Sequence, residues 1–286
     1  MKTVGVIGGS GLYEMEGLEQ VDEIFLETPY GNPSDVIISG HLGGTRLLFV
    51  PRHGRGHNYL PHEVPYRANI WALKELGADW CISLSAVGSL REEIVPGHVV
   101  LIDQFIDRTK GRPSSFFGDG VAGHVAFGEP ISPVLQEVLV GAARDAGATL
   151  HVGGTYVCME GPAFSTRAES ELYRSWGASV IGMTNLPEAK LAREAEIAYA
   201  TVALATDYDC WHPGHDDVSV DAVIATLKKN VTLAKKIVAL AASRIPDDLD
   251  PLVDGASRFA VMTAPDRIPA HRREALRPII GKYLAS

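Results

Sequence analysis

The sequence contains few cysteines and lacks any long apolar run. Its three cysteines, Cys81, Cys158 and Cys210, are scattered and odd in number, so no disulfide framework is indicated. No apolar run approaches the ~18 residues of a membrane span, and the first residues lead into an apolar segment without the architecture of a signal peptide. We therefore expect a cytoplasmic protein with no membrane partner.

Positive charge is also scarce. The 26 lysines and arginines face 35 aspartates and glutamates, which gives a formal net charge of −9 over 286 residues. Because this balance would repel a nucleic acid or an anionic membrane surface, neither is an expected partner. An anionic substrate would need a local basic pocket. Hydrophobic residues make up 46% of the chain, enough for the sizeable core of a globular protein.

Short apolar runs alternate with longer segments of helical spacing, which predicts an α/β fold with a largely parallel or mixed sheet. The predicted strands cover 3–7, 46–50, 80–84, 98–102, 154–158, 179–183 and 199–206. The predicted helices cover 66–76, 131–146, 166–176, 187–195, 219–243 and 270–284. The stretch 107–130 is polar and has no clear period, so we expect a long loop there.

Two carboxylates, Asp207 and Asp209, end the last apolar run. Residues two apart in an extended chain point to the same side, so both acids can reach one site. Like charges held close are hard to ionise together, and burial raises the pKa of at least one of them. A protonated acid could donate to a heterocycle while its partner accepts. A solvated turn after a strand is the open alternative, since aspartate is common in turns.

A glycine-rich turn, Gly8-Gly9-Ser10-Gly11, follows the first predicted strand. Such a turn lets backbone amides and the Ser10 hydroxyl approach a phosphate closely. It fails as a dinucleotide fingerprint, because Glu14 stands where the third glycine should be. A free phosphate therefore fits better than a dinucleotide, and a purely structural turn is the alternative.

Further polar groups follow other predicted strands. The segment 51–57 contains Arg52 and His53; arginine binds phosphate oxygens in a bidentate fork, and histidine can add a donor. The segments 83–90 and 183–185 supply small hydroxyl side chains. Ligands of open α/β sheets gather outside the carboxyl ends of strands, so these groups are expected to share one crevice. A solvated surface loop is the alternative for 51–57.

A metal site is not expected. Cys210, His212 and His215 lie close in sequence, but their spacing matches no common zinc signature. Pro213-Gly214 indicates an exposed turn between the two histidines.

Five segments of the chain form a joint pattern. They are Gly8-Gly9-Ser10-Gly11-Leu12, Arg52-His53-Gly54-Arg55, Tyr66-Arg67-Ala68-Asn69-Ile70-Trp71-Ala72-Leu73-Lys74, Glu160-Gly161-Pro162-Ala163-Phe164-Ser165-Thr166-Arg167-Ala168-Glu169-Ser170 and Ala205-Thr206-Asp207-Tyr208-Asp209-Cys210-Trp211. Together they resemble the 5′-methylthioadenosine phosphorylases of the trimeric purine nucleoside phosphorylase family. The resemblance implies a single nucleoside phosphorylase domain over 1–245, with a mixed central sheet flanked by helices. An extension over 246–286 with a final helix would pack on the same domain or on a neighbour.

The resemblance implies phosphorolysis, in which 5′-methylthioadenosine and phosphate give adenine and 5-methylthioribose 1-phosphate. Phosphate is then a co-substrate, and no cofactor is implied. The residues that match the phosphate site are Ser10, Arg52, His53, Ser85, the amide of Ala86, and Thr184. Ser10 and Ser85 stand where many relatives carry threonine, a change that keeps the hydroxyl.

The resemblance also assigns the nucleoside site. Phe164 and Met183 match residues that flank the base and ribose. Asp207 matches the acid that faces N7 of the purine, and Asp209 matches a residue that supports recognition of the 6-amino group.

Further matches concern the methylthio group and the oligomer. Val220 and Ile224 match the apolar pocket for the methylthio group. His124 matches a residue that closes this pocket from the neighbouring subunit, and Met262 is the counterpart of a second contact across subunits. A homotrimer, or a dimer of trimers, with shared active sites is therefore implied.

Three alternatives to 5′-methylthioadenosine phosphorolysis remain open. A phosphorylase for 6-oxopurine nucleosides or methylthioinosine typically carries asparagine at the position of Asp207, so the acid disfavours it. A phosphate-independent nucleosidase would be distinguished by activity without phosphate. A non-catalytic dinucleotide-binding module is disfavoured by the failed glycine fingerprint.

Overall fold

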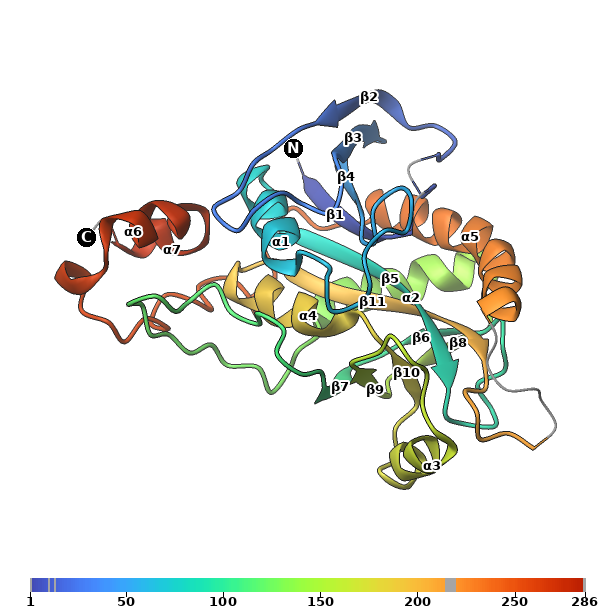
Figure 1. Ribbon diagram of the computed structural model, residues 1–286. Helices are drawn as coiled ribbons and strands as arrows, with labels where there is room; N and C mark the ends of the chain where they lie inside the picture. Colours follow the sequence, from blue (N-terminus) through green and yellow to red (C-terminus); the bar gives the residue numbers. More distant parts are fainter. Residues whose placement is uncertain (1, 10, 13, 214–219, 285–286) are drawn as a thin grey trace.

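The computed structural model describes residues 2–9, 11–12, 14–213 and 220–284, and of most residues in 220–229 it describes the backbone alone. A mixed sheet of eleven strands runs through the centre and is flanked by helices (Figure 1). Parallel and antiparallel pairs both occur, for example β1 with β4 and β3 with β4. The predicted α/β fold with a mixed sheet is confirmed.

All predicted strands are present. The strands are β1 (Thr3–Gly8), β2 (Glu19–Ile24), β3 (Ile37–Leu42), β4 (Thr45–Pro51), β5 (Trp80–Ser89), β6 (Val99–Leu101), β7 (Gln104–Arg108), β8 (Leu150–Val152), β9 (Thr155–Met159), β10 (Val180–Gly182) and β11 (Ala198–Asp207). The sequence pattern did not indicate β2, β3, β7 or β8. β2 is exposed and polar at the sheet edge and β8 has three residues, so neither carries the apolar run that identifies a buried strand.

The helices match their predicted positions with one correction. They are α1 (Tyr66–Glu75), α2 (Pro133–Ala146), α3 (Arg167–Ser175), α4 (Asn185–Glu194), α5 (Val220–Ala242), α6 (Ala270–Ala275) and α7 (Arg277–Leu284), with a short 3₁₀ helix at Pro265–Arg267. The prediction of one helix over 270–284 is wrong, because α6 and α7 are separated at Leu276. Pro278 lacks an N–H and its ring clashes with the carbonyl four residues earlier, so α6 cannot continue through it.

The central strand β5 leaves an opening along one of its edges. Its first edge pairs with parallel β11 over most of its length. Its second edge pairs with β1 as far as Ser83 and with β10 from Gly88 onward. Between these pairings, residues 84–87 have no strand partner on the second edge within the described part of the chain. Backbone groups of β5 are therefore available to a ligand there.

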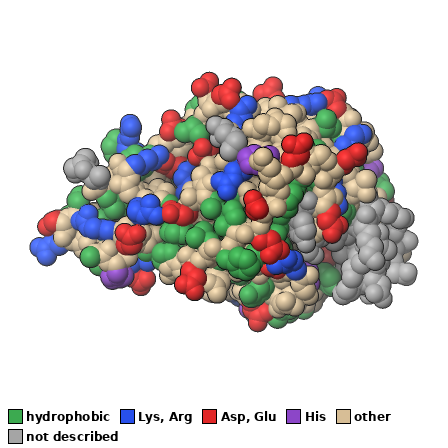
Figure 2. Space-filling view, turned by 90° about the horizontal axis from the view of Figure 1, so that it is seen from above, with side chains coloured by type: hydrophobic (Ala, Val, Ile, Leu, Met, Phe, Trp, Pro, Cys, Tyr) green, Lys and Arg blue, Asp and Glu red, His purple; other side chains and the backbone are tan. Residues whose placement is uncertain are grey.

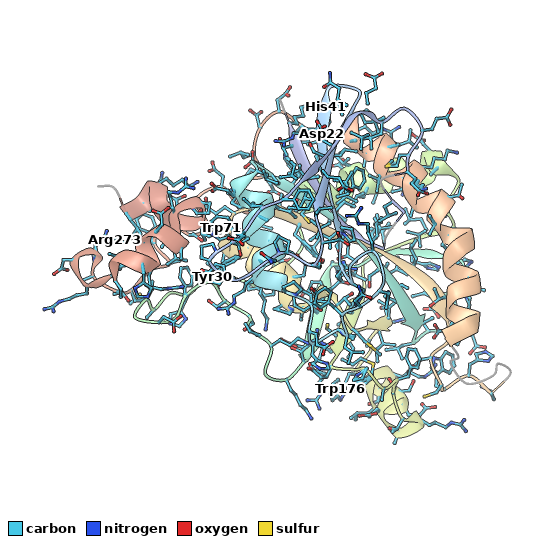
Figure 3. All side chains as sticks on the ribbon, turned by 45° about the horizontal axis from the view of Figure 1, so that its top comes forward. Asp22, Tyr30, His41, Trp71, Trp176 and Arg273 are labelled. Carbon is cyan, nitrogen blue, oxygen red and sulfur yellow. The ribbon has the colours of Figure 1, made fainter. Side chains whose placement is uncertain are left out.

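The C-terminal segment packs on the same chain. Leu276, Ile279 and Ile280 belong to the main hydrophobic core, and the Trp71 indole of α1 donates a hydrogen bond to the Ala275 carbonyl at 2.7 Å. Trp71 and Tyr30 lie between α1 and the α6–α7 pair (Figure 3). The domain boundary at residue 245 remains a prediction.

The surface carries charges of both signs. Basic and acidic side chains are interspersed on the face drawn in Figure 2. Among the described residues, no helix is long and apolar enough to span a membrane. The stretch predicted as a long loop begins with the last residues of β7, and the rest of it contains isolated bridges instead of regular elements.

Candidate active site

Arg52 lies at the opening beside β5, at the point where β4 ends. Its backbone N–H donates to the Gly8 carbonyl at 2.9 Å, which ties it to the end of β1. The residue is only 3% exposed. Its guanidinium donates through Nη1 to the Leu84 carbonyl of β5 at 3.0 Å. Three strands therefore fix the position of this charge.

The bidentate fork of Arg52 is occupied by a protein carboxylate, contrary to the expectation that it faces phosphate. Nε and Nη2 donate to the two carboxylate oxygens of Glu188 at 2.8 and 3.0 Å, and Nη2 also donates to the Ser83 hydroxyl at 2.6 Å. With Leu84 also bonded, four of the five N–H groups of a guanidinium are used. The sequence could not indicate this pairing, because Glu188 is 136 residues away along the chain.

His53 is a neutral acceptor at this opening. Burial lowers its pKa to about 4, so the ring is uncharged near neutral pH. Its Nδ1 lies 2.8 Å from the Tyr59 carbonyl, and since a carbonyl only accepts, Nδ1 carries the hydrogen. Nε2 is left with a lone pair. His53 can therefore accept a hydrogen bond from a protonated phosphate oxygen, where the sequence pattern had indicated a donor.

The other residues assigned to phosphate lie on neighbouring elements. Ser85 is buried on β5, and its hydroxyl lies 3.2 Å from the Tyr156 hydroxyl. Backbone groups alternate between the edges of a strand, so the Ala86 N–H points to the same edge as the Leu84 carbonyl that Arg52 contacts. Thr184 precedes α4 and does not cap it with its side chain. Ser10 lies outside the described residues.

The two acids are brought together by a turn, and the extended-strand explanation of their proximity is wrong. β11 ends at Asp207, and Asp209 has a left-handed φ of 51°. The Asp209 N–H donates to Asp207 Oδ1 at 2.8 Å, which closes the turn. The turn is not solvated, because Asp209 is 6% exposed and Asp207 is half-buried.

Both carboxyls favour the protonated form more than free aspartate does. Burial raises the pKa of Asp207, although the hydroxyl of Thr206, which donates to Oδ2 at 2.7 Å, opposes the rise. Burial also raises the pKa of Asp209, and the neighbouring Asp207 adds to this. Hydrogen bonds from the Ser170 and Ser165 hydroxyls oppose the rise in the pKa of Asp209, and Asp209 Oδ2 is buried without a well-aligned hydrogen bond among the described residues. An unsatisfied buried acceptor of this kind suits a donor on a ligand.

The acids lie directly against β5 because residue 88 is glycine. A Cβ at Gly88 would stand 2.9 Å from Asp207 Oδ1 and 3.3 Å from the Asp209 Cβ. The close approach connects the acids to the strand that also carries Ser85 and Ala86. The phosphate-side residues and the acids therefore share β5.

Met183 and Phe164 lie on two loops that contact each other. The Met183 sulfur would be 2.6 Å from a Cβ at Gly161, a residue with φ of 69°. Glycine at this position therefore lets the two loops meet. Phe164 is 43% exposed, as a side chain at the mouth of a site would be.

Arg112 clamps these two loops, and sequence reasoning missed it. Its buried guanidinium donates to the carbonyls of Met183 at 2.7 Å, Leu186 at 2.9 Å and Glu160 at 2.6 Å. It also donates to the Glu160 carboxylate at 2.9 Å. The sequence gives no distinctive signal for Arg112, because the loop also carries Arg108 and Lys110.

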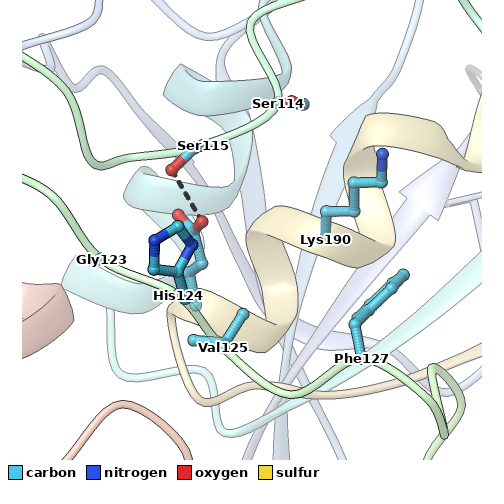
Figure 4. A pocket seen from close by; sticks show the side chains of 8 residues that line it. Ser114, Ser115, Gly123, His124, Val125, Phe127 and Lys190 are labelled. Carbon is cyan, nitrogen blue, oxygen red and sulfur yellow. Dashed lines mark hydrogen bonds between the residues drawn. The ribbon is translucent and has the colours of Figure 1, made fainter. Parts of the chain in front are cut away.

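His124 lies beside the segment of Met262, whose backbone N–H donates to the Ala122 carbonyl at 2.8 Å, and none of the other candidate residues that the structure describes lines its pocket. It lines a separate pocket of about 290 Å³ between α4 and the long loop, with Ser115, Phe127, Lys190 and Glu194 among its neighbours (Figure 4). Glu194 accepts hydrogen bonds from the Ser115 hydroxyl at 2.7 Å and the Phe116 N–H at 2.6 Å. Burial raises the pKa of Glu194 to about 7.

The side chains of Val220 and Ile224 lie outside the described residues, as does His215. Cys210 donates to the Ser165 carbonyl at 3.3 Å, and His212 lies 3.4 Å from Glu92. No group of three or more metal-ligating side chains is found among the residues that the structure describes.

A sequence model described as the phosphorylase superfamily matches residues 3–243, which is most of the chain. The chain belongs to the phosphorylase superfamily. Its β5 opening and its acid pair both lie within the matched residues.

Curated relatives in this superfamily are similar to this chain over nearly the full length of both sequences. The S-methyl-5′-thioadenosine phosphorylase of Geobacter sulfurreducens is 60% identical over 284 residues, covering 99% of each chain. The enzyme of the same name from Chloroflexus aurantiacus is 57% identical over 282 residues, covering 98% of each.

Solved structures of the superfamily share the fold. A methylthioadenosine phosphorylase from an antarctic soil metagenomic library has a TM-score of 0.93 and 47% identity, covering 97% of this chain and 98% of its own. The methylthioadenosine phosphorylase of Schistosoma mansoni in complex with adenine has a TM-score of 0.82 and 34% identity, covering 90% and 99%.

Proposed function

We propose that the chain is a pentosyltransferase that cleaves 5′-methylthioadenosine with phosphate to give adenine and 5-methylthioribose 1-phosphate. The observation that carries the proposal is the arrangement along β5. The Arg52 guanidinium and the Ala86 amide lie where one edge of β5 has no strand partner, His53 follows Arg52 in the chain, and Asp207 and Asp209 lie at Gly88. Full-length identity of 60% to an enzyme of this name supports the choice of substrate.

The role of each group in the reaction follows from where charge develops in the transition state. As the purine leaves, positive charge grows on the ribose and negative charge on the base. Phosphate bound near Arg52, His53 and Thr184 would stabilise and then attack the sugar. Asp207, whose pKa is raised by burial, would donate a proton or hydrogen bond to N7 on the other side. The remaining contribution is positioning of the two substrates.

Base selection is assigned to the second acid. The buried Asp209 Oδ2 has no well-aligned hydrogen bond among the described residues and is suited to accept from the 6-amino group of adenine. A 6-oxo group would place an acceptor against this acceptor, which is unfavourable when buried. Adenine nucleosides are therefore preferred over hypoxanthine nucleosides.

A homotrimer with shared sites is the proposed assembly. His124 is exposed on the long loop, and its backbone N–H donates to the Ala260 carbonyl at 2.9 Å. Met262 and Phe259 on the adjoining segment are 73% and 87% exposed, which is unusual for large apolar side chains. A neighbouring subunit covering these residues would place His124 and Met262 near its own methylthio site, beside Val220 and Ile224.

No cofactor is proposed, since phosphate itself supplies the nucleophile. The cytoplasm is the proposed compartment, because all three cysteines are free and two of them, Cys81 and Cys158, are buried thiols.

The proposal is tested by incubating the purified protein with 5′-methylthioadenosine, with and without phosphate, and measuring released adenine. Release that depends on phosphate is expected. Equal release in phosphate-free buffer would indicate a nucleosidase. Faster turnover of methylthioinosine than of methylthioadenosine would contradict the proposed base preference.

A further inference from the structure

The buried partner of Arg52 is itself fully bonded within the protein. Glu188 is 1% exposed on α4. Besides the two bonds from Arg52, it accepts hydrogen bonds from the Ser83 hydroxyl at 2.7 Å and the Tyr199 hydroxyl at 2.8 Å. The Asn185 amide also donates to Ser83 and to Tyr199, at 3.0 and 2.5 Å. This network extends from β5 to α4 and β11 and holds the carboxylate in place.

The network has an electrostatic consequence for any anion at the opening. Arg52 presents one remaining N–H on Nη1, and its positive charge is already neutralised by Glu188 at 2.8 Å. A buried pair interacts strongly because water does not screen it. His53, the other basic group assigned to phosphate, is neutral. Phosphate would therefore enter a site that holds donors but little net positive charge among the described residues.

We propose that Glu188 is a positioning residue that sets phosphate affinity, by fixing one N–H of Arg52 toward the opening and cancelling the charge of that guanidinium. The inference rests on the proposed phosphorolysis. An unpaired arginine would hold a phosphate dianion, and the sugar phosphate product, much more tightly. Glu188 therefore keeps the site weak enough to release its product.

The test is Glu188→Gln in the full chain, with inorganic phosphate as the probe in calorimetric titration. The amide keeps the size of the side chain and removes its charge. The dissociation constant for phosphate is expected to fall about tenfold or more, because phosphate becomes the counter-ion of Arg52. In turnover, KM for phosphate and kcat are both expected to fall, since the sugar phosphate leaves more slowly.

Glu196→Gln is the matched control. Glu196 is also a buried acid, and it accepts from Lys282 at 2.6 Å and Tyr283 at 2.9 Å, beyond the other end of α4. This variant is expected to lose stability without changing phosphate affinity. Glu188→Asp, which keeps the charge, is expected to stay closer to the parent in phosphate affinity than Glu188→Gln does.

The outcomes separate the two proposals. Phosphate binding that is unchanged or weaker in Glu188→Gln, while the parent binds phosphate, contradicts the role of Glu188 alone. A parent chain that binds no phosphate contradicts the proposed function as well. If Glu188→Gln unfolds in chloride, recovery of the folded form in phosphate supports the role, and failure in both buffers contradicts it.

Discussion

Asp207 and His53, which the proposed function assigns to one site, carry opposite protonation preferences. Burial raises the pKa of Asp207 and lowers that of His53 to about 4, because it disfavours the charged form of either group. The acid is therefore biased toward donating and the imidazole toward accepting. Asp207 therefore suits a purine that needs a proton, and His53 suits a phosphate oxygen that carries one.

Asp207→Asn preserves the shape of the side chain and removes its acidity. We expect kcat with 5′-methylthioadenosine to fall by about 10²–10⁴-fold, the usual contribution of general acid catalysis. Activity toward 6-oxopurine nucleosides is expected to rise relative to the parent. Steady-state kinetics with both nucleosides measures this. A kcat within twofold of the parent would rule out the acid role.

At the scale of elements, the site depends on the second edge of β5, where the paired strand changes from β1 to β10. The sequence predicted β1, β5, β10 and β11 and the meeting of their ends, because buried parallel strands carry continuous apolar runs. It did not predict that β5 continues to Ser89, or that residues 84–87 lack a strand partner on one edge among the described residues. That feature depends on which strands pair, and pairing is set by contacts between distant segments.

Gly88→Ala tests the contact between β5 and the acids. The new methyl group would stand 2.9 Å from Asp207 Oδ1, so the carboxyl must move. We expect kcat to fall by about tenfold or more, since small misplacements of catalytic groups are costly. Gly281→Ala, whose Cβ would meet only the Arg277 side chain at 3.5 Å, is the control. Unchanged kcat in Gly88→Ala would contradict the placement of Asp207.

Glu194 of α4 makes a pH-dependent contact with the long loop, where Ser115 and Phe116 donate hydrogen bonds to it. Because burial raises its folded pKa to about 7, above the usual 4.5, Glu194 favours folding below pH 4.5 and loses that contribution as pH rises through 7. Glu194→Gln should remove this dependence, which is on the order of 3 kcal/mol. We expect the variant to be less sensitive than the parent to a rise from pH 5 to 8 in thermal unfolding. Parallel curves for the two proteins would refute the assignment.

For the whole molecule, the alternation of apolar runs with helical segments and the family motifs predicted the fold, and the site that the motifs assign stays a prediction. The hydroxyls, Arg52 and the acids were indicated because they follow predicted strands. Glu188 and Arg112 were not, since each acts through groups far away in the sequence. Long-range polar contacts inside a core leave no periodic signal.

Sharing of sites between subunits is tested by mixing two inactive variants. His124→Ala and Asp207→Asn would damage different subunits of one shared site. Random mixing in a trimer should restore about one quarter of the sites, because a site is intact only when its own subunit carries His124→Ala and the neighbour that supplies His124 carries Asp207→Asn. Activity measured after unfolding and refolding the mixture is compared with that of each variant refolded alone. No recovery would contradict the shared site.

The central claim is that phosphate attacks the sugar while the acids hold the base. Phosphorus NMR of a reaction with 5′-methylthioadenosine, combined with adenine quantification, tests it most directly. One methylthioribose 1-phosphate should form for each adenine released, with an equal loss of inorganic phosphate. Adenine released with free methylthioribose and unchanged phosphate would contradict the claim.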